Sequence, residues 1–286
     1  MCYNILIMAK IIETPITTIL RQTSIDLAPY VINPYQGCVL GCSFCYAQFS
    51  KKALKEDMPW GDYVKVKINA LEVLEEELER IKPEKVLLGS TTEIFQPAEK
   101  QYHITEGIIK LLNAKDISYV LMSRSPLITG YMPLLKQGKC ESVYFTLNAF
   151  PEELCRLIGE KAPGPETGIA AVRELVKNGI DVRAYLCPIM PGYENWKDIM
   201  EELNGICAVE CESINFRMAA NAELWKKVRE ETPLKAAFYE RLLSSRQFYE
   251  EVMKELEEDI QGMAEKLGII VKAHLHEFEK YFENEY

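Results

Sequence analysis

Three cysteines, Cys38, Cys42 and Cys45, lie within eight residues in the spacing C-x3-C-x2-C. Thiolates this closely spaced can bind one inorganic centre, because a tight loop can turn all of its sulfurs inward. Gly37 and Gly41 precede the first two cysteines and allow the backbone angles that such a loop needs. Three thiolates leave one iron of a four-iron cluster without a protein ligand. The spacing therefore predicts a cluster that binds a small molecule and reacts with it.

This loop resembles the signature of the radical S-adenosylmethionine (radical SAM) superfamily, in which an aromatic residue, here Phe44, precedes the last cysteine. The longer string NPYQGC-x2-GC-x2-CYA, which begins at Asn33, is similar to the branch that contains spore photoproduct lyase and photolyase-like proteins. The resemblance covers most of residues 31–218. It implies a partial (β/α)6 TIM-like barrel.

The resemblance also implies the cofactors. Cys38, Cys42 and Cys45 are expected to hold a [4Fe–4S] cluster whose open iron chelates the amine and carboxylate of S-adenosylmethionine. A one-electron reductant such as ferredoxin or flavodoxin would then drive cleavage of the sulfonium. The resulting 5′-deoxyadenosyl radical would abstract hydrogen from a substrate in the barrel mouth.

Zinc is the main alternative occupant of the cysteine loop. A zinc site needs a fourth ligand, and no Cys or His follows at the spacing of a zinc finger. The nine cysteines, an odd number, suit a reducing cytoplasm and a metal centre better than a disulfide framework. Residues 1–10 lack the features of a secretory signal peptide, so we expect a cytoplasmic protein.

Composition sets further bounds. Hydrophobic residues make up 48% and charged residues 27%, as in ordinary globular proteins. No apolar run approaches the ~20 residues of a membrane-spanning helix. The net charge of −10 opposes non-specific binding to nucleic acid, which depends on Lys and Arg. The most basic stretch is either a solvated surface or a phosphate-binding patch, and it comprises Lys51, Lys52, Lys55, Lys65 and Lys67.

Short apolar strands alternate with amphipathic helices after residue 30. The expected strands are 31–32, 85–90, 119–123, 142–148, 180–189 and 213–218, and the expected helices are 44–56, 71–81, 104–112, 127–136, 169–176 and 196–206. This alternation predicts βαβ units and a parallel sheet, and six units match the partial barrel that the resemblance implies.

The expected domain organisation has three parts. Residues 1–30 form an irregular lead-in, residues 31–221 the barrel, and residues 222–286 a helical extension packed on the barrel. Within the extension, apolar residues at helical spacing predict one long helix over 248–267, followed by a short strand over 269–272.

The cofactor-binding residues that the resemblance implies lie in the cysteine loop or near the carboxyl ends of predicted strands, where such barrels place their working residues. They are Phe44, Tyr46, Gly89, Ser90, Thr91, Ser123, Arg124, Thr146, Asn148, Pro188 and Ile189. Residues 89–91 correspond to the segment that binds the amino group of S-adenosylmethionine, and residues 187–192 to the one that flanks the adenine.

Strand alternation adds Arg183, Arg217 and Cys187, which face the barrel interior. Two arginines in a largely enclosed cavity need an anionic partner. We therefore expect at least one of them to contact the methionine carboxylate or an acidic group of the substrate; pairing with an interior Asp or Glu is the alternative. Cys187, at the mouth, is the candidate catalytic residue.

Two departures weaken the transfer of a substrate from the branch. Glu93 stands where the branch motif has aspartate, and no cysteine lies near residues 86–91, where spore photoproduct lyase carries its hydrogen donor. The prediction is a radical SAM enzyme acting on a nucleic-acid lesion, or alternatively on a peptide or small metabolite. Outside that class, the alternative is a non-catalytic iron–sulfur or zinc-binding module. His103, His274 and His276 are too scattered to indicate a metal site.

Overall fold

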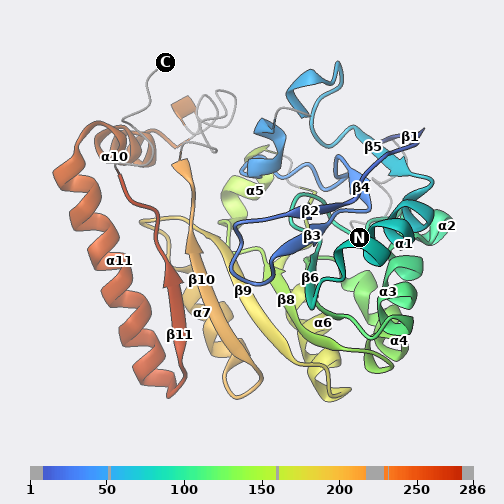
Figure 1. Ribbon diagram of the computed structural model, residues 1–286. Coiled ribbons are helices and arrows are strands. Elements are labelled where there is room, and N and C mark those ends of the chain that lie inside the picture. Colours follow the sequence, from blue (N-terminus) through green and yellow to red (C-terminus); the bar gives the residue numbers. More distant parts are fainter. Residues whose placement is uncertain (1–8, 51–52, 159–160, 217–228, 231, 279–286) are drawn as a thin grey trace. The chain divides into compact units, whose positions relative to one another are not determined.

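The computed structural model describes residues 9–50, 53–158, 161–216, 229–230 and 232–278 (Figure 1). The chain divides into two compact units that exchange segments along the sequence. The first contains Met1–Gly41, Ala47–Thr146 and Lys161–Arg183, and the second contains Cys42–Tyr46, Leu147–Glu160 and Ala184–Tyr286.

The main sheet of the first unit is built from hydrophobic strands. In spatial order they are β2 (Leu20–Gln22), β3 (Tyr30–Ile32), β6 (Lys85–Leu88), β7 (Ser118–Ser123) and β8 (Cys140–Leu147). Strands β3, β6, β7 and β8 are parallel, whereas β2 runs antiparallel to β3. Val86, Leu87 and Leu88 are all buried, as expected for strands covered on both faces. The prediction of an α/β fold with parallel strands is confirmed.

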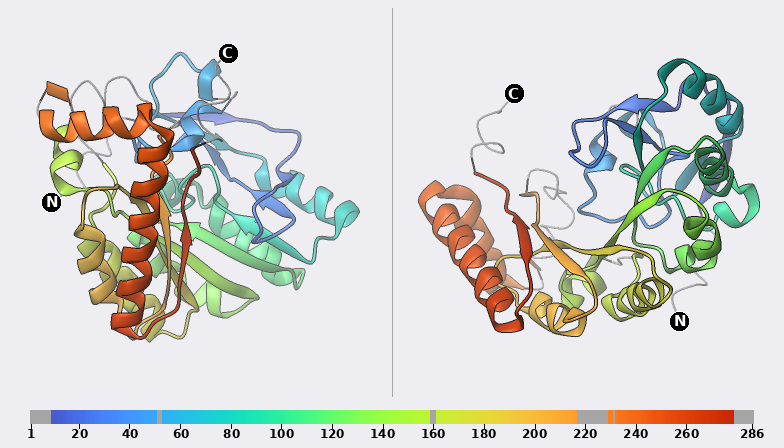
Figure 2. Two further views of the ribbon diagram at one scale, coloured as in Figure 1. Left: turned by 90° about the vertical axis from the view of Figure 1, so that its left-hand side faces the viewer. Right: turned by 60° about the horizontal axis from the view of Figure 1, so that its bottom comes forward.

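Helices of the first unit pack their apolar sides against this sheet. They are α1 (Ala70–Ile81), α2 (Glu99–Tyr102), α3 (Ile104–Ala114), α4 (Met132–Lys136) and α6 (Pro165–Lys177), with a 3-10 turn η4 (Pro126–Tyr131) before α4. Figure 2 shows α1, α3 and α4 along the outer side of β6 and β7. Leu74, Ile108 and Leu112 point into this layer and are at most 1% exposed.

A second, small sheet accompanies the cysteine loop in the first unit. Its strands, in spatial order, are β1 (Lys10–Thr14), β5 (Tyr63–Lys67) and β4 (Tyr35–Gln36). Val64 and Val66 of β5 are fully buried. Since β4 ends at Gln36, the cysteine loop begins directly after this strand, at Gly37.

The helix expected over 44–56 is wrong. The described residues there form two 3-10 turns, η2 (Tyr46–Phe49) and η3 (Ala53–Lys55), while residues 51–52 lie outside the described ranges. Ser50 separates the turns: its N–H donates to Ala47 O, and its Oγ accepts from the N–H of Ala53 at 3.2 Å. Such local side-chain bonds offer the backbone an alternative to a continuous helix.

The second unit contains three strands in the order β9, β10, β11. They are β9 (Val182–Ile189), β10 (Ala208–Ser213) and β11 (Val271–His274), and β11 runs parallel to β10. The helices of this unit are α5 (Glu152–Ile158), α7 (Asn195–Leu203), α10 (Pro233–Ser244) and α11 (Arg246–Leu267).

The strand expected over 213–218 is wrong in position, because β10 ends at Ser213. Gly205, at φ 72°, closes the turn after α7, and the chain enters the sheet soon afterwards. Val209, Cys211 and Ser213 are then at most 1% exposed and form the covered face of the strand. Residues 217–218 lie outside the described ranges.

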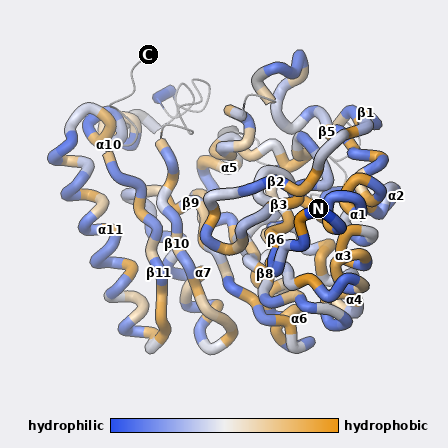
Figure 3. The backbone as a smooth tube through the Cα atoms, viewed as in Figure 1, coloured by the Kyte–Doolittle hydropathy of each residue, from blue (hydrophilic) through white to orange (hydrophobic). Residues whose placement is uncertain are grey.

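Helix α11 is the long amphipathic helix that the sequence predicts. Its N-terminus is capped by Ser245, whose Oγ accepts from the N–H of Phe248 at 3.3 Å, and it ends at Gly268, which has φ 66°. Figure 3 shows hydrophobic and hydrophilic residues alternating along it, and Leu256 and Ile260 belong to its buried stripe.

The C-terminal extension also contributes to the sheet, since the chain after α11 returns as β11 beside β10. None of the helices in the described ranges has the length and apolar character needed to span a membrane.

Candidate functional site

Two side chains from the segment after β6 hold the first half of the cysteine loop. Thr92 Oγ1 donates to the carbonyl of Gly37 at 2.6 Å, and Gln96 Oε1 accepts from the N–H of Val39 at 3.3 Å. Gln96 Nε2 also donates to Thr92 Oγ1 at 3.3 Å, so the two side chains form one buried network. Since the bonded backbone groups flank Cys38 on both sides, this network fixes the backbone position of that cysteine.

The two glycines of the loop lie where another stretch of backbone approaches the loop closely. Gly37 has φ 83°, and a Cβ there would lie 2.5 Å from the carbonyl oxygen of Tyr63. Gly41 has φ 57°, and a Cβ there would lie 2.9 Å from the Cα of Gly61. Both positions therefore exclude a side chain on two counts, backbone conformation and space.

The second half of the loop belongs to the second unit. Cys42 is buried and Cys45 partly exposed, and the N–H of Cys45 donates to the carbonyl of Cys42 at 3.1 Å. The Phe44 ring packs on Phe150 with centroids 5.2 Å apart. Tyr46 is 48% exposed. The two aromatic residues expected near the cofactor thus differ: one is packed within its unit, and the other has a surface that a ligand can reach.

The chemistry of the three cysteines fits an iron–sulfur cluster. They supply three thiol sulfurs on two successive turns, because Gly41 N–H also donates to the carbonyl of Cys38 at 3.1 Å. Within the described ranges, no group of three or more His, Cys, Asp or Glu side chains is gathered as a ready metal site. The assignment of Cys38, Cys42 and Cys45 as ligands therefore rests on spacing and donor type and stays a prediction.

Asn33 positions the loop that follows β6. Its Nδ2 donates to Ser90 Oγ at 3.2 Å, and its Oδ1 accepts from the N–H of Thr91 at 3.0 Å. Gly89, which opens this loop, has φ 91°, and a Cβ there would lie 2.6 Å from the carbonyl oxygen of Met122. The segment expected to bind the amino group of S-adenosylmethionine is thus held in a defined conformation. Its positioning residue, Asn33, was signalled only by its place in the NPYQGC string.

Glu93 organises the end of β7. Its carboxylate accepts from Ser123 Oγ at 2.7 Å, from the N–H of Arg124 at 2.8 Å and from the N–H of Phe95 at 2.9 Å. Burial raises the pKa of Glu93, and the three donors oppose that shift. The Ser123 hydroxyl also accepts from the N–H of Ser125 at 3.1 Å. Ser123 therefore serves the shape of this loop, and its expected contact with the cofactor stays a prediction.

The two residues near the end of β8 lie in different units. Thr146 is partly exposed and belongs to the first unit, whereas Asn148 is 5% exposed and belongs to the second. Asn148 Oδ1 accepts from the N–H of Phe150 at 3.0 Å, and its Nδ2 lies 3.7 Å from the sulfur of Cys155. Asn148 thus shapes the turn after the strand, and its expected contact with the cofactor stays a prediction.

Cys187 lies on β9, and its expected position at the barrel mouth stays a prediction. Its thiol donates to Glu212 Oε2 at 3.2 Å, and the Tyr185 hydroxyl donates to the same oxygen at 3.1 Å. The peptide bond between Cys187 and Pro188 is cis, and Pro188 and Ile189 are buried. The thiol is thus partly exposed and directed at a carboxylate of the neighbouring strand.

Two carboxylate–imidazole pairs accompany this thiol. His276 Nε2 lies 3.2 Å from Glu212 Oε1, and His274 Nε2 lies 2.9 Å from Glu210 Oε2. The sequence reasoning missed both acids, because it began the strand at Ser213. The available signal was the alternation in AVECES, where apolar or small residues alternate with the two glutamates.

The structure describes only one of the two arginines that the sequence placed in the barrel interior. Arg183 is exposed, with its guanidinium carbon 5.9 Å from the centroid of the Tyr144 ring. The argument from an enclosed cavity therefore does not apply to Arg183, although its contact with a ligand stays a prediction. Arg217 lies outside the described residues.

Two lysines of the basic stretch form contacts within the protein. Lys65 lies 2.5 Å from Glu56, and Lys67 donates to the carbonyl oxygen of Asn33. Lys55 is exposed, whereas Lys51 and Lys52 lie outside the described ranges. Lys65 and Lys67 are therefore less suited to phosphate than the sequence suggests.

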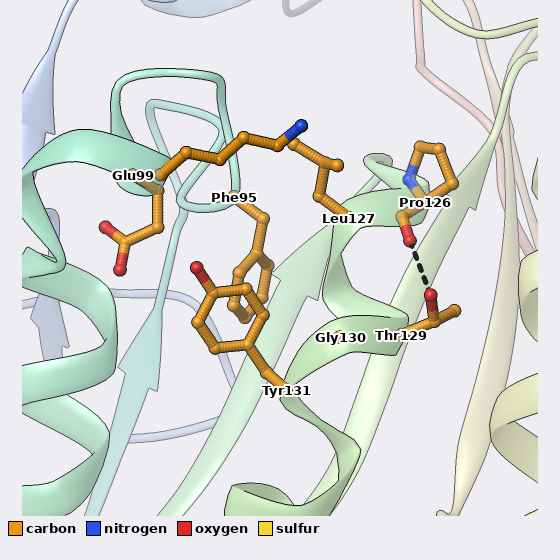
Figure 4. Close-up of a pocket in the computed structure, with 8 residues that line it drawn as sticks. Phe95, Glu99, Pro126, Leu127, Thr129, Gly130 and Tyr131 are labelled. Carbon is orange, nitrogen blue, oxygen red and sulfur yellow. Dashed lines mark hydrogen bonds between the residues drawn. The ribbon is translucent and has the colours of Figure 1, made fainter.

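A cavity of about 340 Å³ lies in the first unit (Figure 4). Phe95 and Tyr131 line it, with ring centroids 4.8 Å apart. Glu99 borders it, but the carboxylate of Glu99 accepts from the N–H groups of Thr105 and Glu106, both at 2.9 Å, at the start of α3. Glu99 is thus committed to holding a helix terminus, and the cavity is lined by none of the predicted site residues.

A comparison with protein families decides the classification. The family model described as "Radical SAM superfamily" matches residues 32–204, more than half of the chain. The chain belongs to the radical SAM superfamily. Proteins of this superfamily use a [4Fe–4S] cluster and S-adenosylmethionine, and the matched range contains the cysteine loop.

Curated relatives of this radical SAM protein match over part of their length. An uncharacterized protein of Methanocaldococcus jannaschii is 33% identical over 172 residues, which is 60% of this chain and 64% of the relative. An uncharacterized protein of Mycobacterium tuberculosis is 28% identical over 184 residues, or 62% of this chain and 54% of the relative. The matched stretch thus spans less than two thirds of each relative.

Solved structures of spore photoproduct lyase share the fold. The enzyme complexed with dinucleoside spore photoproduct gives a TM-score of 0.64 at 16% identity, covering 93% of this chain and 82% of that one. A variant with bound AdoMet and the same dinucleoside gives 0.65 at 16% identity, covering 92% and 80%. At this identity the likeness establishes the fold alone.

Proposed function

We propose that this radical SAM protein is an enzyme that cleaves S-adenosylmethionine reductively and removes a hydrogen atom from a substrate at the mouth of a partial (β/α)6 barrel. The observation that carries the proposal is the cysteine loop. Its spacing falls inside the matched family range, and buried Thr92 and Gln96 fix the backbone on both sides of Cys38. A loop held this firmly is suited to present thiolates to a cluster.

Cys38, Cys42 and Cys45 would hold the [4Fe–4S] cluster. When bound, the cluster and S-adenosylmethionine supply a 5′-deoxyadenosyl radical, and the protein contributes orientation and exclusion of water. Asn33 holds the 89–91 loop ready for the amino group of the cofactor. Arg124, whose backbone N–H donates to Glu93, is the candidate for binding the methionine carboxylate.

Cys187 is the candidate catalytic residue in this proposal. It is partly exposed, and its Sγ–H is directed toward Glu212 on the next strand of the unit. A thiol at this position can exchange a hydrogen with a substrate bound beside it.

The first candidate substrate is a nucleic-acid lesion, because spore photoproduct lyase has been solved with a dinucleoside photoproduct and shares the fold. The second is a peptide or small metabolite. It is favoured by the net charge of −10 and by the internal contacts of Lys65 and Lys67. A one-electron donor such as ferredoxin or flavodoxin is the expected partner, and a reducing cytoplasm is the expected location.

Anaerobic reconstitution with iron and sulfide tests the proposed activity. The expected result is bound iron and sulfide in a four-to-four ratio and formation of 5′-deoxyadenosine from S-adenosylmethionine after dithionite reduction. Stoichiometric zinc without iron would favour a zinc-binding module instead. A bound cluster without cleavage would favour a non-catalytic iron–sulfur protein.

Binding of DNA separates the substrate classes. A duplex that contains ultraviolet photoproducts is titrated at low and moderate salt, because binding through phosphates weakens steeply as salt rises. If a nucleic acid is the substrate, charge reversal at Lys51 together with Lys55 lowers affinity. Unaltered affinity in that variant, or no binding at low salt, supports the peptide or metabolite alternative.

A further inference from the structure

Three side chains from two segments of the second unit contact the carboxylate of Glu212. Its Oε2 accepts from the Cys187 thiol at 3.2 Å and from the Tyr185 hydroxyl at 3.1 Å, both on β9. Its Oε1 lies 3.2 Å from Nε2 of His276, which follows β11. Oε2 therefore accepts two hydrogen bonds, one of them from the thiol, and Oε1 lies beside the imidazole.

The residues around Glu212 are fixed by independent contacts. Glu212 stands between Cys211 and Ser213, which are at most 1% exposed on the opposite face of β10. The N–H of His276 donates to Ser213 Oγ at 3.1 Å, and the carbonyl of His276 accepts from the Tyr249 hydroxyl of α11 at 2.8 Å. The C-terminal segment thus places an imidazole beside Glu212 through its backbone.

These contacts determine which of the side chains around Glu212 carry a charge. Burial opposes the charge on Glu212, but the contacts with His276, Cys187 and Tyr185 outweigh it and lower the pKa of this carboxyl. Burial, and next the negative charge of Glu212, raises the pKa of Tyr185, which keeps its proton. A fixed negative charge 3.2 Å from the sulfur likewise opposes ionisation of the Cys187 thiol.

We propose that Glu212, held in place by His276, is the positioning residue that keeps Cys187 as a protonated, oriented thiol. The inference rests on the proposed function, in which Cys187 faces the substrate. A thiol that stays protonated is a poor nucleophile and a poor metal ligand. Glu212 therefore keeps Cys187 available to the substrate and out of competition with Cys38, Cys42 and Cys45 for iron.

The test is the rate at which iodoacetamide alkylates Cys187 in the reconstituted, full-length protein, followed by peptide mass spectrometry under anaerobic conditions. Glu212→Gln removes the charge while keeping the shape. At pH 7.5 it raises the Cys187 rate at least about fivefold, since one unit of thiol pKa is a tenfold change in thiolate. Glu212→Asp, which retains the charge, restores most of the protection.

Glu210→Gln is the matched control. Glu210 lies on the same strand as Glu212 and pairs with His274. The ring centroid of His274 is 6.0 Å from that of Tyr185, so Glu210 and His274 are titratable groups beside the Glu212 contacts. Glu210→Gln leaves the Cys187 rate within about twofold of wild type, because charge effects fall with distance. Cys155 alkylation in each sample is the internal reference.

The pH profile separates positioning from loosening of the structure. If Glu212 acts through its charge, the wild-type and Glu212→Gln rates converge at high pH, where the thiol is ionised in both. A loosened site keeps their ratio constant at every pH and overturns the proposal, as do equal rates in Glu212→Gln and Glu210→Gln. The assay requires no cleavage of S-adenosylmethionine. Failure of the proposed enzymatic activity and failure of this inference are therefore seen separately.

Discussion

The two units hold their candidate site residues by different kinds of contact. In the first unit, Thr92, Gln96 and Asn33 bind backbone N–H and carbonyl groups of the loops they position. In the second unit, Glu212 binds the side chains of Cys187 and Tyr185. Cys38 is therefore positioned through neutral side chains that bind the backbone, and Cys187 through groups that titrate.

This difference has a physical consequence. Hydrogen bonds from neutral side chains to the backbone do not depend on pH, so they hold the cysteine loop in one conformation under all conditions that preserve the fold. Contacts among a carboxylate, an imidazole, a thiol and a phenol depend on which groups carry protons. The position of Cys38 is therefore independent of pH, whereas the reactivity of Cys187 is adjustable.

Removal of a single cysteine of the C-x3-C-x2-C loop has the largest expected effect, because each is one of only three predicted thiolate ligands. Cys38→Ala in the first unit, or Cys42→Ala or Cys45→Ala in the second, should abolish iron binding and 5′-deoxyadenosine formation, since a three-thiolate site loses an essential ligand. Iron and sulfide analysis after anaerobic reconstitution measures this. Cys140→Ala and Cys155→Ala serve as controls and should retain both properties. Full iron content in Cys42→Ala would contradict the ligand assignment.

Gly37→Ala tests the backbone of the cysteine loop in the first unit. The φ of 83° and the 2.5 Å approach to Tyr63 predict a loss of about 2–4 kcal/mol in the free energy of unfolding. Urea denaturation of the apoprotein measures it. Gly262→Ala, in the exposed interior of α11 with nothing near its Cβ, should instead stabilise by up to about 1 kcal/mol. Equal effects of the two substitutions would show that the loop has room to adjust.

Gln96→Ala sharpens the comparison, because it removes one backbone clamp and leaves the N–H of Val39 without its acceptor. The expected cost is about 1–3 kcal/mol in the free energy of unfolding, unchanged between pH 6 and pH 8. Slower iron incorporation should accompany it. Gln101→Ala, at an exposed position in α2, is the control. A strong pH dependence of the Gln96→Ala effect would break the distinction between the two units.

Glu212→Gln should have the smallest effect on stability and the clearest pH dependence. The pKa of Glu212 is lowered on folding, so its charge contributes stability above the ordinary carboxyl pKa of 4.5 and loses that contribution as the pH falls through the folded value. The wild type should therefore be more stable than Glu212→Gln at pH 7, and the gap should close as the pH falls below the ordinary carboxyl pKa of 4.5 and through the lower folded value. Urea denaturation at pH 7 and over this acid range measures it, with exposed Glu255→Gln as the control. A gap that persists at low pH would mean that shape, and not charge, makes Glu212 important.

The two wrong secondary-structure predictions have a common cause. Apolar spacing over 44–56 suits a helix, but Ser50 forms local bonds that divide the segment. Apolar alternation over 213–218 suits a strand, but β10 occupies Ala208–Ser213. In both cases contacts that the apolar spacing does not reveal set the boundaries, namely the local hydrogen bonds of Ser50 in the first and pairing with β11 in the second.

The sequence by itself determined the cysteine loop, its need for glycine at Gly37 and Gly41, the alternation of strands and helices, and the apolar stripe of α11. These features are local, because each depends on residue types within a few turns or on one strand. Only the tertiary structure decided that Glu212 meets Cys187 and His276, which are far apart in the chain. Their contact depends on where β10 begins, on its pairing with β11 and on the backbone bonds of His276 to Ser213 and Tyr249. Strand register and order arise from packing of the whole unit, and no local pattern encodes them.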